Sequence, residues 1–301
     1  MEVFSLIMDD GTHLKGRFWK ATDEKAVLQI VHGASEYSLR YQDFAQWLTE
    51  RGVSVYALDN RGHGLNQTPG TDKVYMKAGD GYKIPKDVIA LGERIARDHP
   101  DVEITLLGHS MGSFIARAVA GLPNPYDKYI FVGSAYQDPV VLKAGRALVR
   151  SIRLVKGNRS ASKVLDDMTF NNLRKSMRKK GLIKDDHEWL TTDIAQGDKN
   201  RDDKVLGQKF TLGAYRALFD LIKQAQDLDT IKNTQKPVLL LTGLQDPVSD
   251  YGKTVKRLAR RYRKYGNPHV EEIYYEGMRH EVLNERNRQK VYQDTLHYIF
   301  N

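Results

Sequence analysis

Short apolar runs recur along most of this 301-residue chain, and longer stretches of mixed apolar and polar residues separate them. The runs are continuous rather than alternating, which is typical of β-strands that are buried on both faces. Intervening stretches of about 10–15 residues predict helices, and this alternation favours a mainly parallel sheet with helices on both faces. The strands expected in this sheet cover residues 26–31, 53–58, 102–107, 129–133, 237–243 and 270–276.

The two ends of the chain add a hairpin and a closing helix to this α/β scheme. Residues 2–8 and 13–19 are strand-like and flank an Asp-Asp-Gly-Thr turn, so they predict a hairpin. The helices expected from apolar spacing and end signals cover residues 41–51, 85–99, 113–120, 253–264 and 285–300.

One long segment, residues 140–234, departs from this rhythm. Its composition is helical, and it contains no clear strand signal between two strands of the expected sheet. An excursion of this length predicts an inserted helical cap. The expected domain organisation is therefore a core formed by residues 1–139 and 235–301, with a cap or lid formed by residues 140–234.

The positive charge of the chain is concentrated in this predicted cap. The whole chain carries a net charge of +9. Residues 140–234 hold 20 lysines and arginines against 12 aspartates and glutamates, which accounts for +8 of that total. A nucleic-acid-binding protein usually presents a continuous basic face with interleaved aromatic residues, so this local bias does not predict nucleic acid as a partner.

The composition and the N-terminus limit the remaining possibilities. The chain has no cysteine, which excludes disulfides, thiol catalysis and cysteine-ligated zinc. The first ten residues lack the basic start and long apolar core of a signal peptide, and no apolar run approaches the roughly 20 residues of a membrane span. These features predict a cytoplasmic protein. The histidines are scattered, and we expect neither a metal nor a cofactor.

The most informative motif is Gly-His-Ser-Met-Gly at residues 108–112. The apolar run before it predicts a buried strand, and the run after it predicts a helix that ends near Gly121. A serine on a tight strand-to-helix turn is the setting of a nucleophile elbow, where flanking glycines avoid clashes. Ser110 is therefore the candidate nucleophile.

A serine hydroxyl needs a base to take its proton and an acid to orient that base. Asp246 and His280 directly follow two later strands of the expected sheet, and parallel sheets place functional loops at such ends. The order Ser110, Asp246, His280 is also the order of an α/β-hydrolase triad. Asp138, which follows the strand at 129–133, is the competing candidate for the acid.

An oxyanion intermediate needs two backbone N–H donors. One is expected from Met111, the residue after the nucleophile, at the start of a helix whose dipole helps. The other is expected from Ala34, in the loop after the strand at 26–31, with Gly33 allowing close approach.

Four motifs together resemble the monoacylglycerol lipase and lysophospholipase family of α/β-hydrolases, some of whose members are classed as serine aminopeptidases. The motifs are HGASEYS at residues 32–38, DNRGHG at 59–64, GHSMG at 108–112 and HEVLNE at 280–285. The resemblance extends over nearly the whole chain and is weakest in the basic segment. At Ser35 this chain departs from relatives, which often have glycine there.

The resemblance implies the α/β-hydrolase fold with an inserted cap. It also implies hydrolysis of carboxylic esters with a single acyl chain, without a metal or cofactor. The expected substrates are monoacylglycerols, lysophospholipids or short acyl esters, cleaved through an acyl-enzyme on Ser110. Carried over by position, Ser110, Asp246 and His280 form the triad, and Ala34 and Met111 the oxyanion hole.

Two other functions stay open. An aminopeptidase or amidase would use the same triad but needs an acidic pocket for a substrate amine, and a non-catalytic binding protein would use the fold alone. The basic residues of the cap are either solvated or attract anionic lipid surfaces and lysolipid phosphates. The same two interpretations apply to the basic helix expected over residues 253–264.

Overall fold

The structure is a computed structural model that describes all 301 residues apart from the side chain of His187. An eight-stranded sheet runs through the molecule in the order β1-β2-β4-β3-β5-β6-β7-β8. The strands are β1 (Glu2–Ile7), β2 (His13–Trp19), β3 (Ala26–Val31), β4 (Val53–Leu58), β5 (Ile104–His109), β6 (Lys128–Val132), β7 (Val238–Gly243) and β8 (Val270–Tyr275). Only the pairs β1–β2 and β2–β4 are antiparallel, which confirms the predicted hairpin and the mainly parallel sheet.

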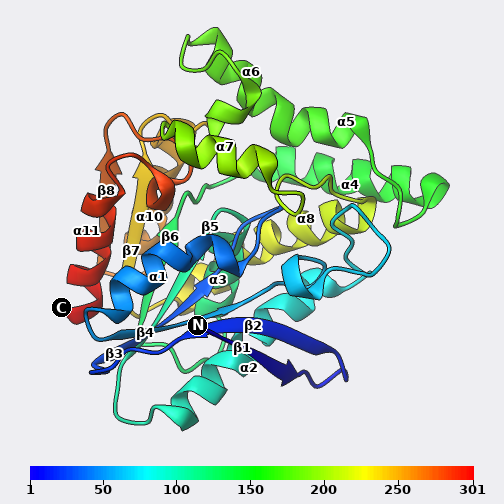
Figure 1. The fold of residues 1–301 in the computed structure, drawn as a ribbon. Helices are drawn as coiled ribbons and strands as arrows, with labels where there is room; N and C mark the ends of the chain where they lie inside the picture. Colours follow the sequence, from blue (N-terminus) through cyan, green and yellow to red (C-terminus); the bar gives the residue numbers. More distant parts are fainter.

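Helices cover both faces of this sheet, as the continuous apolar runs predicted (Figure 1). The two helices on one face are α1 (Gln42–Thr49) and α11 (Arg288–Phe300). The helices on the other face are α2 (Asp80–Asp98), α3 (Met111–Ala120), α8 (Leu212–Gln226) and α10 (Lys253–Lys264). Successive strand residues enter opposite layers: Leu106 packs under α3, whereas Leu107 packs on the side of α1.

The start of α2 differs from the sequence expectation. The helix was expected from Pro85, but it begins five residues earlier, at Asp80. Pro85 lacks an N–H and leaves the carbonyl of Gly81 without its helical donor. The amide of Gln224 in α8 donates to that carbonyl over 2.7 Å, so a partner distant in sequence makes the longer helix possible.

Two other boundaries differ for local reasons. The strand expected over residues 102–107 runs instead over 104–109, because β5 keeps pairing with β6 up to His109. The final helix begins at Arg288 rather than Glu285. The carboxylate of Glu285 accepts the backbone N–H of Arg279 at 2.7 Å, which holds this residue in the loop before the helix.

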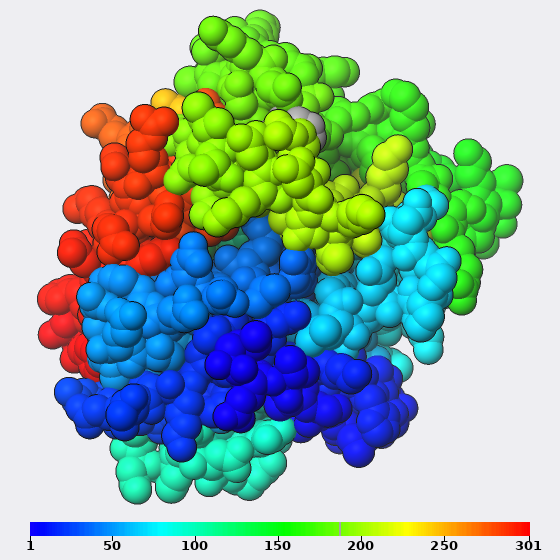
Figure 2. Space-filling model, in the orientation of Figure 1, coloured from blue at the N-terminus to red at the C-terminus, as the bar shows by residue number. Residues whose placement is uncertain are grey.

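The segment between β6 and β7 is helical. Its α-helices are α4 (Pro139–Lys156), α5 (Lys163–Asp166), α6 (Asn172–Lys179), α7 (Ile194–Asp202), α8 and α9 (Leu228–Asn233). Figure 1 shows α4 to α7 stacked beyond the carboxyl ends of the strands, while α8 lies against the sheet layer. In the space-filling view these helices cover one end of the molecule (Figure 2).

No helix in the described part of the chain combines the length and hydropathy that a bilayer span requires.

Candidate active site

Ser110 lies on the turn between β5 and α3, with φ 52° and ψ −117°. A side chain on either neighbouring glycine would clash, since a Cβ on Gly112 would lie 2.0 Å from the carbonyl oxygen of Val31 and one on Gly108 would lie 2.2 Å from backbone. The backbone N–H of Ser110 donates to the carbonyl of Val132 at 2.9 Å. These constraints hold a non-glycine residue in the left-handed region, where backbone strain is stored.

Asp246 and His280 meet in the loops after β7 and β8. The Nδ1 of His280 lies 3.0 Å from Oδ1 of Asp246, and both side chains are almost fully buried. The same carboxylate oxygen accepts the N–H of Val248 at 2.8 Å, which fixes its orientation. With Nδ1–H donating to Asp246, the imidazole keeps the lone pair of Nε2 for a base.

The charges around His280 favour its protonated form. Burial acts to lower the pKa of His280, but the charge of Asp246 and its hydrogen bond outweigh burial and raise that pKa above its ordinary value. Glu281 and Glu36 act in the same direction. The ring of His280 lies 5.0 Å from that of His109, the neighbour of Ser110.

Asp138, the competing acid, has a different position. It is the N-cap of α4, and its Oδ1 accepts the N–H groups of Val140 at 2.8 Å and Val141 at 3.4 Å. Asp138 is exposed, and capping accounts for its Oδ1 atom. The geometry therefore favours Asp246 as the partner of His280.

The loop after β3 orients the expected oxyanion donor. The N–H of Asn60 donates to Nε2 of His32 at 2.8 Å, so the ring proton of His32 is on Nδ1 and donates to the carbonyl of Gly33 at 2.8 Å. In a trans peptide the carbonyl and the next N–H point in opposite directions. The N–H of Ala34 is therefore turned away from His32, and Ala34 lines the same cavity as Ser110.

Met111 is the first residue of α3, so its N–H is one of the free donors of that helix start. Met111 also lines the cavity with Ser110 and Ala34. Glycine at position 33 allows this close approach, because a Cβ there would lie 2.6 Å from Oε1 of Glu36 and 3.1 Å from Cβ of Ser110. Three of the predicted residues thus line one cavity, and the other two are bonded to each other in the loops after β7 and β8.

Ser35 has an unusual backbone angle and two hydrogen bonds to a distant segment. Its φ of 56° lies in the left-handed region, which glycine adopts without strain. The hydroxyl of Ser35 donates to the carbonyl of Gln208 at 2.7 Å, and the carbonyl of Ser35 accepts the N–H of Gly207 at 2.9 Å. In this chain the residue joins the loop after β3 to the segment between α7 and α8.

A buried ion network beside the site was missed by the sequence analysis. Arg40 donates to both carboxylate oxygens of Glu281 at 2.7 Å and to Glu36 at 2.8 Å. Glu36 also contacts Nδ1 of His109 at 2.9 Å. Burial acts to raise the pKa of Glu36, but His109 and Arg40 outweigh it and hold that pKa well below its usual range. The network links the loop after β3 to the loop of His280.

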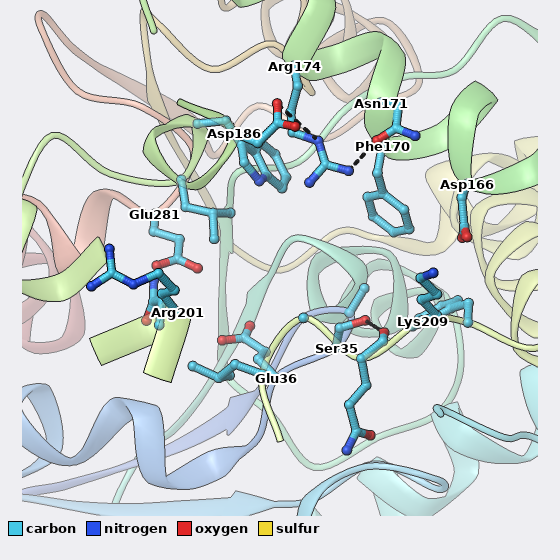
Figure 3. A pocket seen from close by; sticks show the side chains of 18 of the residues that line it. Ser35, Glu36, Asp166, Phe170, Asn171, Arg174, Asp186, Arg201, Lys209 and Glu281 are labelled. Atoms are coloured by element: carbon cyan, nitrogen blue, oxygen red, sulfur yellow. Dashed lines mark hydrogen bonds and ion pairs between the residues drawn. The ribbon is translucent and has the colours of Figure 1, made fainter. Parts of the chain in front are cut away.

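Two adjoining cavities lie between the carboxyl ends of the strands and the helical segment that follows β6. The first, of about 230 Å³, has a mostly apolar lining that includes Ser110, Phe114 and Leu142. The second, of about 650 Å³ and called the polar cavity below, is lined by many charged side chains as well as apolar ones (Figure 3), with Glu36 and Glu281 on the side of the sheet and Arg174 on the side of α6. The residues that line both cavities are Ala34, Phe170 and Trp189.

The described residues contain no group of three or more histidine, aspartate or glutamate side chains placed to hold a metal ion.

Comparison with known proteins gives concordant matches. A family model described as serine aminopeptidase, S33, matches residues 22–287. The monoglyceride lipase of Mus musculus is 36% identical over 138 residues, which cover 46% of this chain and only 43% of the mouse protein. The monoacylglycerol lipase of Mycolicibacterium smegmatis is 28% identical over 287 residues, or 92% of this chain and 89% of that protein.

Solved structures are similar over nearly the full length. A lipase in an open form has a TM-score of 0.83 at 23% identity and covers 99% of this chain and 98% of its own. A soluble variant of the monoglyceride lipase of Saccharomyces cerevisiae has a TM-score of 0.77 at 18% identity, covering 99% of this chain and 94% of its own. These likenesses establish the fold, which is the α/β-hydrolase fold expected from the motifs.

Proposed function

This chain belongs to the serine aminopeptidase S33 family, and from that premise we propose that it is a serine hydrolase that cleaves carboxylic esters carrying a single acyl chain. The observation that carries the proposal is the buried, directly bonded pair Asp246–His280, whose imidazole lies 5.0 Å from the ring of His109, the residue before a serine with φ 52°. Relatives named monoglyceride lipase support an ester hydrolase. Ser110, Asp246 and His280 are the proposed triad, and Ala34 and Met111 the proposed oxyanion hole.

The proposed reaction has two half-reactions. Nε2 of His280 takes the proton of Ser110 Oγ as Oγ bonds to the ester carbon, and the N–H groups of Ala34 and Met111 bind the resulting oxyanion. The carbon–oxygen bond to the alcohol then breaks, and the alcohol leaves with the proton from His280. Water repeats the sequence on the acyl-enzyme and releases the carboxylic acid. Asp246 holds the imidazole tautomer and stabilises its cation.

The two cavities suggest how the ester lies. Ala34 lines both of them, so the ester carbonyl is placed at their junction. The acyl chain then occupies the apolar cavity of about 230 Å³. The alcohol part occupies the polar cavity of about 650 Å³. This orientation suits a monoacylglycerol, a lysophospholipid or a short acyl ester, all of which have one acyl chain and a polar alcohol.

An aminopeptidase or amidase with the same triad is less well supported. Such an enzyme needs a free carboxylate for the substrate amine. Five carboxylates line the polar cavity. Glu36 and Glu281 are ion-paired with Arg40 at 2.7–2.8 Å, Asp167 is paired with Lys163 and Asp186 with Arg178. Asp166 accepts the hydroxyl of Tyr215. A binding protein without activity would have no need for the Asp246–His280 pair.

A substrate panel tests the proposed function. We expect turnover of p-nitrophenyl esters from acetyl to palmitoyl and of monoacylglycerols and lysophospholipids, and little turnover of aminoacyl anilides. The matched comparison is an ester and an anilide with the same acyl group, measured by kcat/KM at one pH. Faster cleavage of the anilide would favour the peptidase, and no turnover of either would favour a binding protein.

We further propose that residues 140–234 act as a cap over the core of residues 1–139 and 235–301, and that this cap contacts an anionic lipid surface. Val141 and Met168 line the apolar cavity although 62% and 51% of their surfaces are exposed, so the cavity opens beside them. Val140, the residue before Val141, is 76% exposed, and Lys143 is an exposed cation on the same helix. Exposed apolar residues with flanking cations suit an anionic bilayer.

Vesicle binding tests this contact. A Val140→Glu variant should bind vesicles of phosphatidylglycerol and phosphatidylcholine about tenfold less tightly, because it loses apolar burial and gains repulsion. Glutamate suits the first turn of α4, so folding should be unaffected. The matched control is Val3→Glu on β1, 56% exposed and outside the cap. Equal binding by both variants, in co-sedimentation assays, would contradict the contact.

A further inference from the structure

The indole of Trp189, from the cap, lies flat against the imidazole of His280. The two ring centroids are 5.3 Å apart and the planes differ by 15°, which is an offset stack. Trp189 is the last residue of a short 3₁₀ turn, Asp186–Trp189, between α6 and α7. A residue of the inserted segment therefore contacts the proposed base directly, more than 90 positions away in the sequence.

The backbone on both sides of this stack is fastened together. Arg279, before His280, donates to the carbonyls of Glu188 and Thr191, the second over 3.0 Å. Glu281, after His280, donates its backbone N–H to the carbonyl of Leu190 at 2.8 Å. The neighbours of Trp189 are thus bonded to the neighbours of His280. The stack has a fixed register and does not depend on ring contact alone.

The same segment is held at further points. The guanidinium of Arg279 also donates to the carbonyl of Leu182 at 2.7 Å, and the hydroxyl of Thr191 donates to the carbonyl of Asn284 at 2.9 Å. Glu285 accepts the N–H of Thr192 at 2.9 Å. The segment around Trp189 is therefore held against the loop of His280 by several hydrogen bonds, although it is part of the cap in sequence.

Asp246 and Trp189 approach His280 from different directions. Asp246 lies in the plane of the imidazole at Nδ1, whereas Trp189 covers one of its faces. An aromatic face attracts a cation, and the attraction strengthens in a site that excludes water. When His280 takes the proton from Ser110 Oγ, the new positive charge lies against the indole.

We propose that Trp189 is a positioning residue for His280, supplied by the cap, whose indole face holds the imidazole and stabilises the imidazolium that forms during ester cleavage. This inference rests on the proposed function, because it takes His280 as the base. It goes beyond that function by giving the cap a part in the chemistry as well as in substrate access. Trp189 also lines both cavities, at the junction where the ester carbonyl is placed.

Two substitutions test whether the aromatic ring of Trp189 or only its apolar volume supports catalysis. Trp189→Leu keeps an apolar covering but removes the ring, whereas Trp189→Phe keeps a smaller ring. On a soluble ester such as p-nitrophenyl butyrate, we expect Trp189→Leu to lower kcat about tenfold with KM changed less than about threefold. Trp189→Phe should stay within about threefold of the parent. Equal kcat in all three proteins, or equal loss in both variants, would overturn the proposal.

The pH profile gives a readout that a purely structural role would not move. Activity falls as the pH drops through the pKa of His280, and the indole face favours the protonated ring. Trp189→Leu should therefore shift the acid limb of kcat/KM to lower pH, and an unshifted limb would overturn the proposal. The variants leave unchanged the charged and titratable groups around His280, namely Asp246, His109, Glu36, Glu281, Arg40 and Arg279.

Phe170 provides a matched control. It lines the same two cavities, but its neighbouring rings are those of Phe210 and Tyr215, with centroids 6.1 Å and 6.5 Å away. Phe170→Leu should change KM and leave the acid limb where it is in the parent. A shift of the limb as large as that of Trp189→Leu would show that any loss of aromatic lining suffices, and would overturn the specific role of Trp189.

Fluorescence tests the stack without catalysis. A protonated imidazole quenches the fluorescence of a stacked indole. Subtracting the emission of Trp189→Phe from that of the parent gives the emission of Trp189, which should rise with pH. Its midpoint should follow the acid limb of the parent, and a His280→Gln variant should abolish the titration. If the difference in emission did not change with pH, the proposed stack would be overturned. If Ser110→Ala kept its esterase activity while the signal titrated, the proposed function would fail and the stack would stand.

Discussion

Turnover of p-nitrophenyl butyrate should fall by about 10⁴–10⁶-fold in a Ser110→Ala variant, and labelling by a fluorophosphonate should be lost. The proposed acyl-enzyme needs the Oγ atom of Ser110, and alanine removes only that atom. The backbone angles of Ser110 are set by contacts of Gly108, Gly112 and Val132, so the turn should keep its shape. Steady-state kinetics and intact-protein mass spectrometry measure the two effects.

Ser113 is the matched control for this prediction. It lies one turn further along α3, and its hydroxyl donates to the carbonyl of Ser110 at 2.6 Å. A Ser113→Ala variant should therefore keep fluorophosphonate labelling. Circular dichroism and thermal unfolding should show that both variants are folded. Retained labelling or turnover in the Ser110→Ala protein would rule out Ser110 as the nucleophile.

The main features of the fold were predictable because they depend on local patterns. The strands at residues 26–31 and 53–58 have the predicted bounds, since continuous apolar runs mark strands covered on both faces. Ser110, Asp246 and His280 each follow a strand of one parallel sheet. Parallel strands end at the same edge, so the sequence order alone brings these residues together.

Other features depend on contacts between distant segments and leave no local signal. Pro85 lies inside α2 because Gln224 supplies the missing donor to Gly81. The ion pair of Arg40 with Glu281 joins residues 241 positions apart, and a single arginine near a motif gives no sign of that. No local signal distinguishes Trp189 from the other apolar residues between positions 140 and 234. Its contact with His280 depends on the bonds of Arg279 to the cap backbone.

Substituting asparagine for Asp246 tests which carboxylate is the partner of His280. An Asp246→Asn variant should lose about 10³–10⁴-fold in kcat, because the imidazolium of His280 loses its counter-charge and its tautomer is no longer fixed. Oδ1 of Asp246 holds both His280 and the N–H of Val248, whereas the buried Oδ2 has no hydrogen-bond partner among the described residues. An asparagine therefore either buries an unpaired amide or turns its NH₂ group toward Nδ1 of His280.

The pH dependence of that variant has a definite sign. Asp246 raises the pKa of His280, and activity requires the neutral imidazole, so activity falls as the pH drops through that raised value. Removing the charge should lower the pKa of His280 and move the acid limb of kcat/KM to lower pH, even as the plateau falls. A profile of kcat/KM between pH 5 and 9 measures both changes.

Asp138→Asn is the control that separates the two candidate acids. Asparagine caps helices about as well as aspartate, so α4 should keep its bonds from Val140 and Val141 and the protein should keep its stability. Its kcat should stay within about twofold of the parent. If Asp138→Asn lost activity while Asp246→Asn kept it, the acid would lie after β6 and the bond between Asp246 and His280 would be structural.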